Sequence, residues 1–376
     1  MNNNSIEFKN KYLKYKNKYI ILRDQLFFTN DTRIKQMGGA YVLQCDSDVK
    51  GPFDSLQMCE AKKDHIARQQ LQIAKSAPQL IAKKFGRKLP NRLDEDSYRS
   101  RRQLILLKTL RLFEIQSDGL YYHRLARDNL ARWAVTAANK PQKSKSKCVV
   151  SVIEDDWGNV THEFTKQHGV CFAVLNMANA YRPGGGYTSG ASAQEENMIR
   201  RTDCHFALDR NEMRVNKKKQ LIYSEQLTDL INGKYGQVYL DMDKPRVCIR
   251  GSENFDASDL GYELLPNNEI FPFYELRAAA VDLSREEHLY DHAETRKRVA
   301  AQLNTLIRYG VRHVVLSAFG CGAFKNPPKE VALAYYQELM TRHKYFDVVV
   351  FAIFYAGSGE RNYQVFHTQF STWNVS

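Results

Sequence analysis

The chain has 376 residues, of which 43% are hydrophobic, and a formal net charge of +13. This content is enough to bury a full core, which excludes disorder throughout and predicts one large domain with an appendage. No stretch approaches the roughly 18 consecutive apolar residues of a membrane span, and the first residues lack the apolar core of a secretory signal, so we expect an intracellular protein, cytoplasmic or nuclear, away from membranes.

Residues 1–40 are predicted to be a basic amphipathic leader helix. Its apolar stripe recurs in steps of four and three between lysines, at Phe8, Tyr12, Tyr15, Tyr19, Leu22 and Leu26. Such a stripe suits docking on the main domain, dimerisation or contact with another partner, so the oligomeric state stays open. The run KNKYLKYKNKYI, followed by Gly38-Gly39, also resembles leader regions of giant DNA virus proteins, which implies virion packaging or proteolytic trimming.

Residues 41–140 are predicted to be a helical accessory region, with amphipathic helices near Ser97–Ile115 and Tyr122–Val135. Basic residues concentrate outside the predicted core, in segments 9–18, 83–102 and 140–147. The last segment, KPQKSKSK, is typical of a flexible loop. These clusters are compatible with solvated faces, with nucleic acid or with another polyanion.

Residues 141–376 are predicted to form an α/β domain in which a mixed sheet lies between helices. Strands are expected at 148–153, 170–175, 237–240, 247–249, 275–283, 314–319 and 348–355. Helices are expected at 194–206, 285–309 and 329–342.

The first motif follows the strand Val170–Leu175, whose continuous apolar run is typical of a strand buried on both faces. Asn176 and Asn179 come at its carboxyl end, where open α/β sheets bind ligands. Pro183 then ends regular pairing. Gly184, Gly185 and Gly186 can adopt positive φ and approach a substrate closely, so we expect their N–H groups to face substrate oxygen atoms.

A helix is predicted to begin near Ser192, the expected N-cap, with Glu195 three positions later completing a capping box. Capping alone would explain Glu195. It would not explain Glu196, which is expected to point toward the loop or solvent. Because adjacent side chains on a helix diverge by about 100°, the two acids are not expected to flank one bond from opposite sides.

A second motif follows the predicted strand Val314–Phe319. Gly320-Cys321-Gly322 predicts a turn that presents N–H groups, and Pro327-Pro328 predicts the start of a helix whose positive end faces phosphate. The alternative is an ordinary strand-to-helix turn that needs glycine only for its geometry. Cys321 is expected to be a small packed residue rather than a nucleophile.

Metal and cofactor sites are not expected. Seven cysteines without a Cys-x-x-Cys pair argue against a disulfide framework and a zinc ribbon, and favour a reducing compartment. His288 and His292 have helical i, i+4 spacing, but a solvated helix face explains this better than a metal site. Asp241 and Asp243 are expected in a surface loop.

Together, Asn176-Met-Ala-Asn179, Pro183–Gly186 and Gln194-Glu195-Glu196 resemble the signature of the poly(ADP-ribose) glycohydrolases, particularly the compact microbial type. The segment from His313 to Pro328, HVVLSAFGCGAFKNPP, resembles the second, diphosphate-facing loop of that family. The likeness covers the chain from about residue 148 to the end and is weaker from residue 97. Ser317 and Lys325 depart from the family pattern.

The resemblance implies a macrodomain fold and cleavage of ribose–ribose O-glycosidic bonds in poly(ADP-ribose), without cofactor or metal. Such cleavage passes through an oxocarbenium-like transition state, so the leaving oxygen needs a proton. The family assigns that proton to the second glutamate, Glu196, and we expect Glu195 to fix ribose hydroxyls. The predicted substrate-binding residues are Asn176, Asn179, Gly184, Gly185, Gly186, Gln194, Gly320, Cys321, Gly322, Ala323, Phe324 and Tyr355.

Within that set, Asn179 and Phe324 are expected at the terminal ribose, Gln194 as a brace for the loop, and Tyr355 against adenine. The expected partners are poly(ADP-ribose) or ADP-ribosylated proteins. Two other functions fit parts of the sequence: a macrodomain that binds ADP-ribose without cutting it, and a basic nucleic-acid-associated protein whose site is idle. The glutamate pair argues against the first of these, since macrodomain readers lack that acid.

Overall fold

The computed structural model describes residues 32–37, 40–45, 48–53, 95–114, 120–139, 148–208, 213–216, 221–257, 260–284, 288–354 and 361–373. The chain divides into two units, Met1–Tyr98 and Arg99–Ser376. The stripe of the predicted leader helix, from Phe8 to Leu26, lies outside the described residues.

The first unit contains an antiparallel sheet of β1 (Thr32–Met37), β2 (Ala40–Cys45) and β3 (Asp48–Phe53). Met37 pairs with Ala40, so β1 and β2 are separated only by Gly38 and Gly39. Strand β2 contains the strand formers Tyr41 and Val42. The helical prediction is therefore wrong for these three segments.

Two helices precede the main sheet, as predicted. They are α3 (Glu95–Glu114), which spans the boundary between the units, and α4 (Tyr121–Ala138). The inner face of α4 buries Ala126 and Trp133, while the amide of buried Asn129 donates to the carbonyls of Asn267 and Ile270. These contacts hold α4 against the loop that leads into the sheet.

The second unit is built on a seven-stranded sheet in the order β4-β12-β11-β5-β10-β8, with β9 also paired to β10. Its strands are β4 (Val149–Ile153), β5 (Ala173–Met177), β8 (Tyr239–Leu240), β9 (Arg246–Cys248), β10 (Phe271–Ala278), β11 (His313–Leu316) and β12 (Val348–Ala352). Neighbours from β4 to β10 run parallel, while β8 and β9 run antiparallel to β10. The predicted mixed sheet is confirmed.

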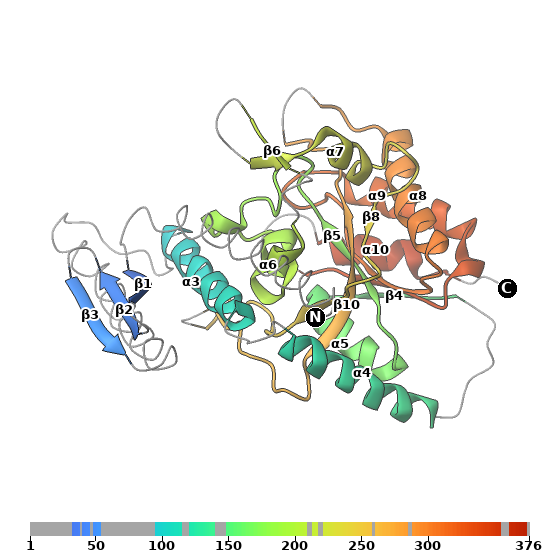
Figure 1. Ribbon diagram of the computed structural model, residues 1–376. Helices are drawn as coiled ribbons and strands as arrows, with labels where there is room; N and C mark the ends of the chain where they lie inside the picture. Colours follow the sequence, from blue (N-terminus) through green and yellow to red (C-terminus); the bar gives the residue numbers. More distant parts are fainter. Residues whose placement is uncertain are drawn as a thin grey trace, which may run out of the picture. The chain divides into compact units, whose positions relative to one another are not determined.

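Side chains alternate between the two faces of this sheet. Leu175, Leu276 and Phe351 join the core cluster that includes residues of α8 (His292–Arg308), α9 (Pro328–Met340) and α10 (Asn362–Phe370). On the other face, Phe172 and Phe273 contact side chains of α5 (Trp157–His168). In Figure 1, α8, α9 and α10 lie together on one side of the strands, and α4 and α5 lie apart from this group. The sheet therefore lies between helices.

Several predicted boundaries differ from the structure, and those of two strands show why. The strand predicted at 170–175 runs from Ala173 to Met177, and the one predicted at 275–283 runs from Phe271 to Ala278. The early residues of β10 pair with β9, whereas Leu283 donates its N–H to Phe324 in a loop. Pairing partners far along the chain therefore set both ends.

The remaining elements are short and surround the strand ends. They are α6 (Gln194–Arg201), α7 (Glu225–Ile231), β6 (Met213–Val215), β7 (Leu221–Tyr223) and the 3-10 turns η1 (Tyr187–Ser189), η2 (Cys204–Ala207) and η4 (His343–Tyr345). Within the described ranges, each helix is too short or too polar to cross a bilayer.

Candidate active site

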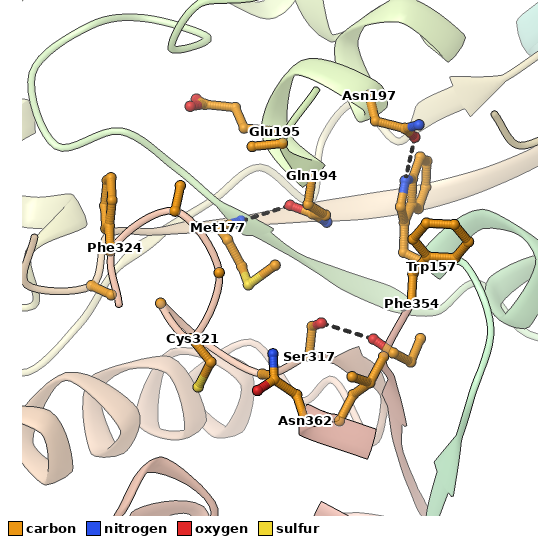
Figure 2. Close-up of a pocket in the computed structure, with 18 of the residues that line it drawn as sticks. Trp157, Met177, Gln194, Glu195, Asn197, Ser317, Cys321, Phe324, Phe354 and Asn362 are labelled. Atoms are coloured by element: carbon orange, nitrogen blue, oxygen red, sulfur yellow. Dashed lines mark hydrogen bonds between the residues drawn. The ribbon is translucent and has the colours of Figure 1, made fainter. Parts of the chain in front are cut away.

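A cavity of about 770 Å³ opens at the carboxyl ends of the five parallel strands. Each of these strands contributes to its lining through residues at or just after its end: Glu154, Asn179, Ala280, Ser317 and Phe354. Figure 2 shows Gln194 and Glu195 on one side of this cavity and Ser317 and Cys321 on the other. This is the edge at which open α/β sheets bind ligands.

Glu195 and Glu196 begin helix α6, line the cavity and are 3% and 7% exposed. One oxygen of each carboxyl group is fixed by a backbone N–H: Glu195 Oε2 accepts from Asn179 and Glu196 Oε1 accepts from Gly186, both at 2.8 Å. The other oxygen of each accepts no hydrogen bond from the described protein atoms. The pair is therefore held rigidly, with one acceptor on each side chain left for a ligand.

The capping box predicted for this helix does not form. The N-cap residue is Ala193, with no side-chain cap, and Ser192 lies outside the helix. Glu195 is turned toward Asn179 instead of its own backbone. The alternative in which Glu195 merely caps its helix is thereby overturned.

The environment of Glu195 favours the protonated form. Burial, followed by the neighbouring carboxyl of Glu196, raises the pKa of Glu195 well above its usual range, although the Asn179 N–H and the Arg277 charge oppose this. This carboxyl therefore keeps its proton to a higher pH than an exposed glutamate does.

The triple glycine contacts the two glutamates rather than lining the cavity. Gly184 and Gly185 adopt φ angles of +75° and +58°, and a Cβ on Gly185 would lie 2.4 Å from Glu196 Oε1 and 2.9 Å from Glu195 Oε2. The Gly185 N–H donates to Arg182, and the Gly186 N–H donates to Glu196. The expectation that these N–H groups face the substrate is corrected: this loop needs glycine because carboxylates pack against it.

The two asparagines of the first motif have separate positions. Asn179 lines the cavity, and its side-chain oxygen accepts from the N–H groups of Tyr181 and Arg182, which fixes the loop. Asn176 is 1% exposed and donates to Glu275, so it lies behind the cavity instead of in its lining. Burial alone would raise the pKa of Glu275, but its arginine neighbours, chiefly Arg277, lower it to about 2.

Gln194 connects helix α6 to strand β5. Its side-chain oxygen accepts from the Met177 N–H at 3.0 Å, and its amide donates to the Leu175 carbonyl at 2.8 Å. These two bonds set where α6 begins relative to the end of the strand. Gln194 therefore braces the start of α6 against β5, and the bracing of the loop expected from the sequence stays a prediction.

The second loop lines the cavity with its backbone. Gly320, Cys321, Gly322, Ala323 and Phe324 all belong to the lining. The N–H groups of Gly322, Ala323 and Phe324 donate to no protein group in the described chain. Three consecutive free donors at a cavity surface form a site suited to anionic oxygen atoms.

Asn326 keeps this second loop in shape. It is 3% exposed, and its amide donates to the carbonyls of Val281, Gly320 and Phe324 at 2.8 to 3.3 Å. Pro327 and Pro328 follow, line the cavity and start α9 as predicted.

An aromatic wall formed by Trp157, Phe255 and Phe354 lines another part of the cavity. Phe255 and Phe354 are 42% and 49% exposed, and their rings are stacked with centroids 6.4 Å apart. Figure 2 shows Trp157 and Phe354 at the end of the cavity opposite Phe324. The cavity therefore has an aromatic end and a glutamate end.

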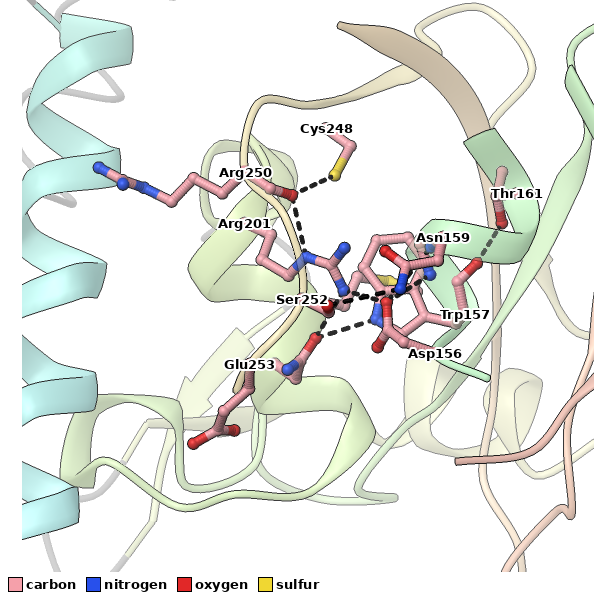
Figure 3. Close-up of polar contacts among 12 residues, drawn as sticks. Asp156, Trp157, Asn159, Thr161, Arg201, Cys248, Arg250, Ser252 and Glu253 are labelled. Atoms are coloured by element: carbon pink, nitrogen blue, oxygen red, sulfur yellow. Dashed lines mark hydrogen bonds and ion pairs between the residues drawn. The ribbon is translucent and has the colours of Figure 1, made fainter. Parts of the chain in front are cut away.

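Trp157 is fixed by polar neighbours (Figure 3). Its indole N–H donates to Asn197 at 3.0 Å, and the Arg201 guanidinium lies 4.7 Å from the ring centroid. Arg201 is in turn paired with Asp156, the N-cap of α5. Helix α6 thus carries the glutamate pair and also holds Trp157 in this wall.

Residues 93–228 match the family described as microbial-type PARG, catalytic domain, where PARG denotes poly(ADP-ribose) glycohydrolase. This part of the chain is similar to the catalytic domain of the microbial-type PARGs. The match includes Asn179, the triple glycine and both glutamates, and it ends before the second loop. The resemblance predicted from the sequence is confirmed by this match, which also supports the expectation of a glycosidase.

Solved PARG structures are similar to this chain at lower levels of likeness. PARG from Thermomonospora curvata is 22% identical, over 72% of this chain and 99% of that chain, with a TM-score of 0.49. PARG from Deinococcus radiodurans in complex with ADP-ribose is 22% identical, over 67% and 91%, with a TM-score of 0.44. No curated protein matches the chain.

The aromatic wall of the cavity, formed by Trp157, Phe255 and Phe354, was not predicted from the sequence. They come from three distant segments and share no sequence spacing, although Phe354 lies within the last predicted strand. Tyr355, which we predicted against adenine, lies outside the described residues.

The histidine pair is not arranged as predicted. His288 precedes α8 and bonds the Asp282 carbonyl, while His292 is the first residue of that helix and pairs with Glu330. Asp291 between them is the N-cap, so the helix starts too late to place both on one face. Across the part of the chain that the structure describes, no group of three or more His, Cys, Asp or Glu is placed to hold a metal ion.

Proposed function

We propose that this chain hydrolyses the ribose–ribose O-glycosidic bonds of poly(ADP-ribose) and releases ADP-ribose. One observation carries the proposal. Two buried glutamates, each with one oxygen fixed by a backbone N–H and one oxygen free, line the same cavity as three free N–H groups. A proton donor and a diphosphate site are thus combined in one pocket.

The cavity suggests how ADP-ribose lies in it. The terminal ribose would lie by Glu195, Glu196 and Phe324, and the diphosphate along the N–H groups from Gly322 to Phe324. Adenine would stack on the exposed rings of Phe255 and Phe354 at the aromatic end. Stacking on Phe354 takes the place that the sequence assigned to the next residue, Tyr355.

The two glutamates would act differently. Glu196 donates a proton to the leaving oxygen as the bond to the anomeric carbon breaks, then accepts a proton from the water that attacks that carbon. Glu195, whose pKa is raised, binds ribose hydroxyls through its free oxygen. The Gly186 N–H holds the Glu196 carboxyl in place throughout.

The test is to incubate the purified chain with automodified poly(ADP-ribose) polymerase and to follow free ADP-ribose. Release of ADP-ribose supports the proposal. Binding of ADP-ribose without release would instead support a macrodomain reader. Salt-sensitive retention of DNA without affinity for ADP-ribose would support the nucleic-acid-associated protein.

A further inference from the structure

Lys325 lies in the second loop in a backbone conformation that its side chain does not favour. Its φ angle is +56°, in the left-handed region that glycine adopts most easily. The turn is firmly held, because the Lys325 N–H donates to the Gly322 carbonyl at 3.0 Å and the Asn326 amide donates to the carbonyls of Gly320 and Phe324. Local geometry alone would favour glycine here, so the lysine calls for another explanation.

The cavity that includes Lys325 is lined by more acidic than basic side chains, which is unusual for a site proposed to bind a polyanion. Its acidic lining residues are Glu154, Asp156, Glu195, Glu196 and Glu253. The cationic residues of the described lining are Lys325 and Arg361. The Lys325 side chain is exposed and forms no hydrogen bond or ion pair with any described residue. Its ammonium group is therefore available to a ligand.

The position of Lys325 indicates which side of the scissile bond it faces. It directly follows Phe324, which lies at the end of the cavity opposite Phe354 (Figure 2). If adenine of the bound unit stacks on Phe354, its terminal ribose lies toward Phe324. The next unit of the polymer is joined to that ribose, so its diphosphate leaves the cavity on the Lys325 side.

We propose that Lys325 binds the diphosphate of the ADP-ribose unit on the leaving side of the bond. The inference rests on the proposed hydrolysis of poly(ADP-ribose). An ammonium group and a phosphate attract each other strongly, and such a contact would favour a polymer over an ADP-ribose that carries a small uncharged group. Lys325 would then determine specificity without taking part in bond cleavage.

The experiment compares two substrates with the parent chain, Lys325→Ala and Lys329→Ala. One substrate is poly(ADP-ribose), and the other is ADP-ribose with 4-nitrophenol on its anomeric carbon, whose leaving group has no phosphate. Lys329 is the matched control, because it is exposed on α9 and does not line the cavity. We expect Lys325→Ala to raise KM for the polymer about 10-fold and to leave the nitrophenyl substrate unchanged.

Salt dependence supplies a second readout. Loss of one phosphate contact should make the slope of log(kcat/KM) against log[salt] shallower by roughly 0.7–0.9 for the polymer. Lys325→Gly should show the same loss while melting at or above the parent temperature, since glycine suits the positive φ. This variant separates the charge from the fold.

Two results would overturn the proposal. Equal losses on both substrates would mean that Lys325 acts on the active site itself, and unchanged kinetics on the polymer would mean that it makes no contact. A parent chain that fails to release ADP-ribose from the polymer would instead refute the proposed function.

Discussion

The two glycine-containing loops of the cavity resemble each other in sequence but differ in what their backbones do. In the first loop, the N–H groups of Gly185 and Gly186 donate to protein, and the loop packs against the carboxyl groups of both glutamates. In the second, the N–H groups from Gly322 to Phe324 remain free at the cavity surface. The first loop therefore orients the two glutamates, and under the proposed function the second loop would bind the ligand.

This difference separates two uses of glycine. A glycine beside a carboxylate allows the close approach of a side chain, whereas a glycine beside open space allows a backbone to face a ligand. Changes in the first loop should therefore reduce kcat, and changes in the second should raise KM.

Among the substitutions that test the difference between the two loops, Gly185→Ala should change activity most. The new Cβ would lie 2.4 Å from Glu196 Oε1, and the φ of +58° adds strain, so both carboxyls must shift. We expect kcat to fall about 100-fold, as a misplacement of about 1 Å does. Steady-state kinetics on poly(ADP-ribose) will measure this.

Gly322→Ala is the control for that change. No atom lies within 4 Å of a Cβ at Gly322, and its φ is outside the left-handed region. The methyl group would enter the cavity, so KM should change and kcat should not. An equal fall of kcat in both variants would contradict the division between the loops.

Phe354→Ala tests the aromatic end. Removing a ring that stacks on adenine should raise KM about 10-fold with little change in kcat, because base stacking contributes about 1–3 kcal/mol. Tyr309→Ala is a suitable control, since Tyr309 is equally exposed at 49% and lies outside the cavity. Unchanged binding of ADP-ribose to Phe354→Ala, measured by calorimetry, would place adenine elsewhere.

Asn326→Ala should loosen the second loop. Three carbonyls lose their shared donor, which should cost about 1–3 kcal/mol of stability and lower the melting temperature by a few degrees. KM should rise while kcat changes little.

Gln194→Ala, which removes the two bonds that set the start of α6, should lower kcat instead. If both variants changed KM and kcat in the same way, the proposed separation between ligand binding and positioning of the glutamates would be contradicted.

Glu195→Gln should have the smallest effect, and it depends on pH. Folding raises the pKa of Glu195, so the folded state favours the protonated carboxyl and loses stability as pH rises above the unfolded value. Glutamine cannot ionise. The variant should therefore gain stability over the parent as pH increases, as thermal melts at pH 4, 6 and 8 will show. A gap that stays constant with pH would indicate that Glu195 has an ordinary pKa.

The strands and motifs were predictable because their signals are local. Continuous apolar runs such as Val314–Leu316 and the Pro327-Pro328 start of α9 depend on neighbouring residues. The partners of those motifs were not predictable, because they depend on distant contacts. Nothing near Gly185 in sequence indicates that carboxylates ten residues later will pack on it, and nothing near Phe255 indicates Phe354.

The position of Asn176 on the other face of the sheet could have been predicted from the sequence. It alternates with Leu175, which faces the core cluster of α8 and α9, so period-two alternation places it on the opposite face with Glu275. The antiparallel pairing of β1 with β2 was not predicted for another reason, since the segment up to Gly38-Gly39 was interpreted as a leader helix.

The central claim is that Glu196, held by the Gly186 N–H in the shared cavity, supplies the proton for bond cleavage. The most direct measurement is the single-turnover rate of ADP-ribose release from poly(ADP-ribose) by Glu196→Gln, together with its affinity for ADP-ribose. We predict a rate lower by roughly 10²–10⁴-fold with affinity near that of the parent. Release at the parental rate would contradict the account.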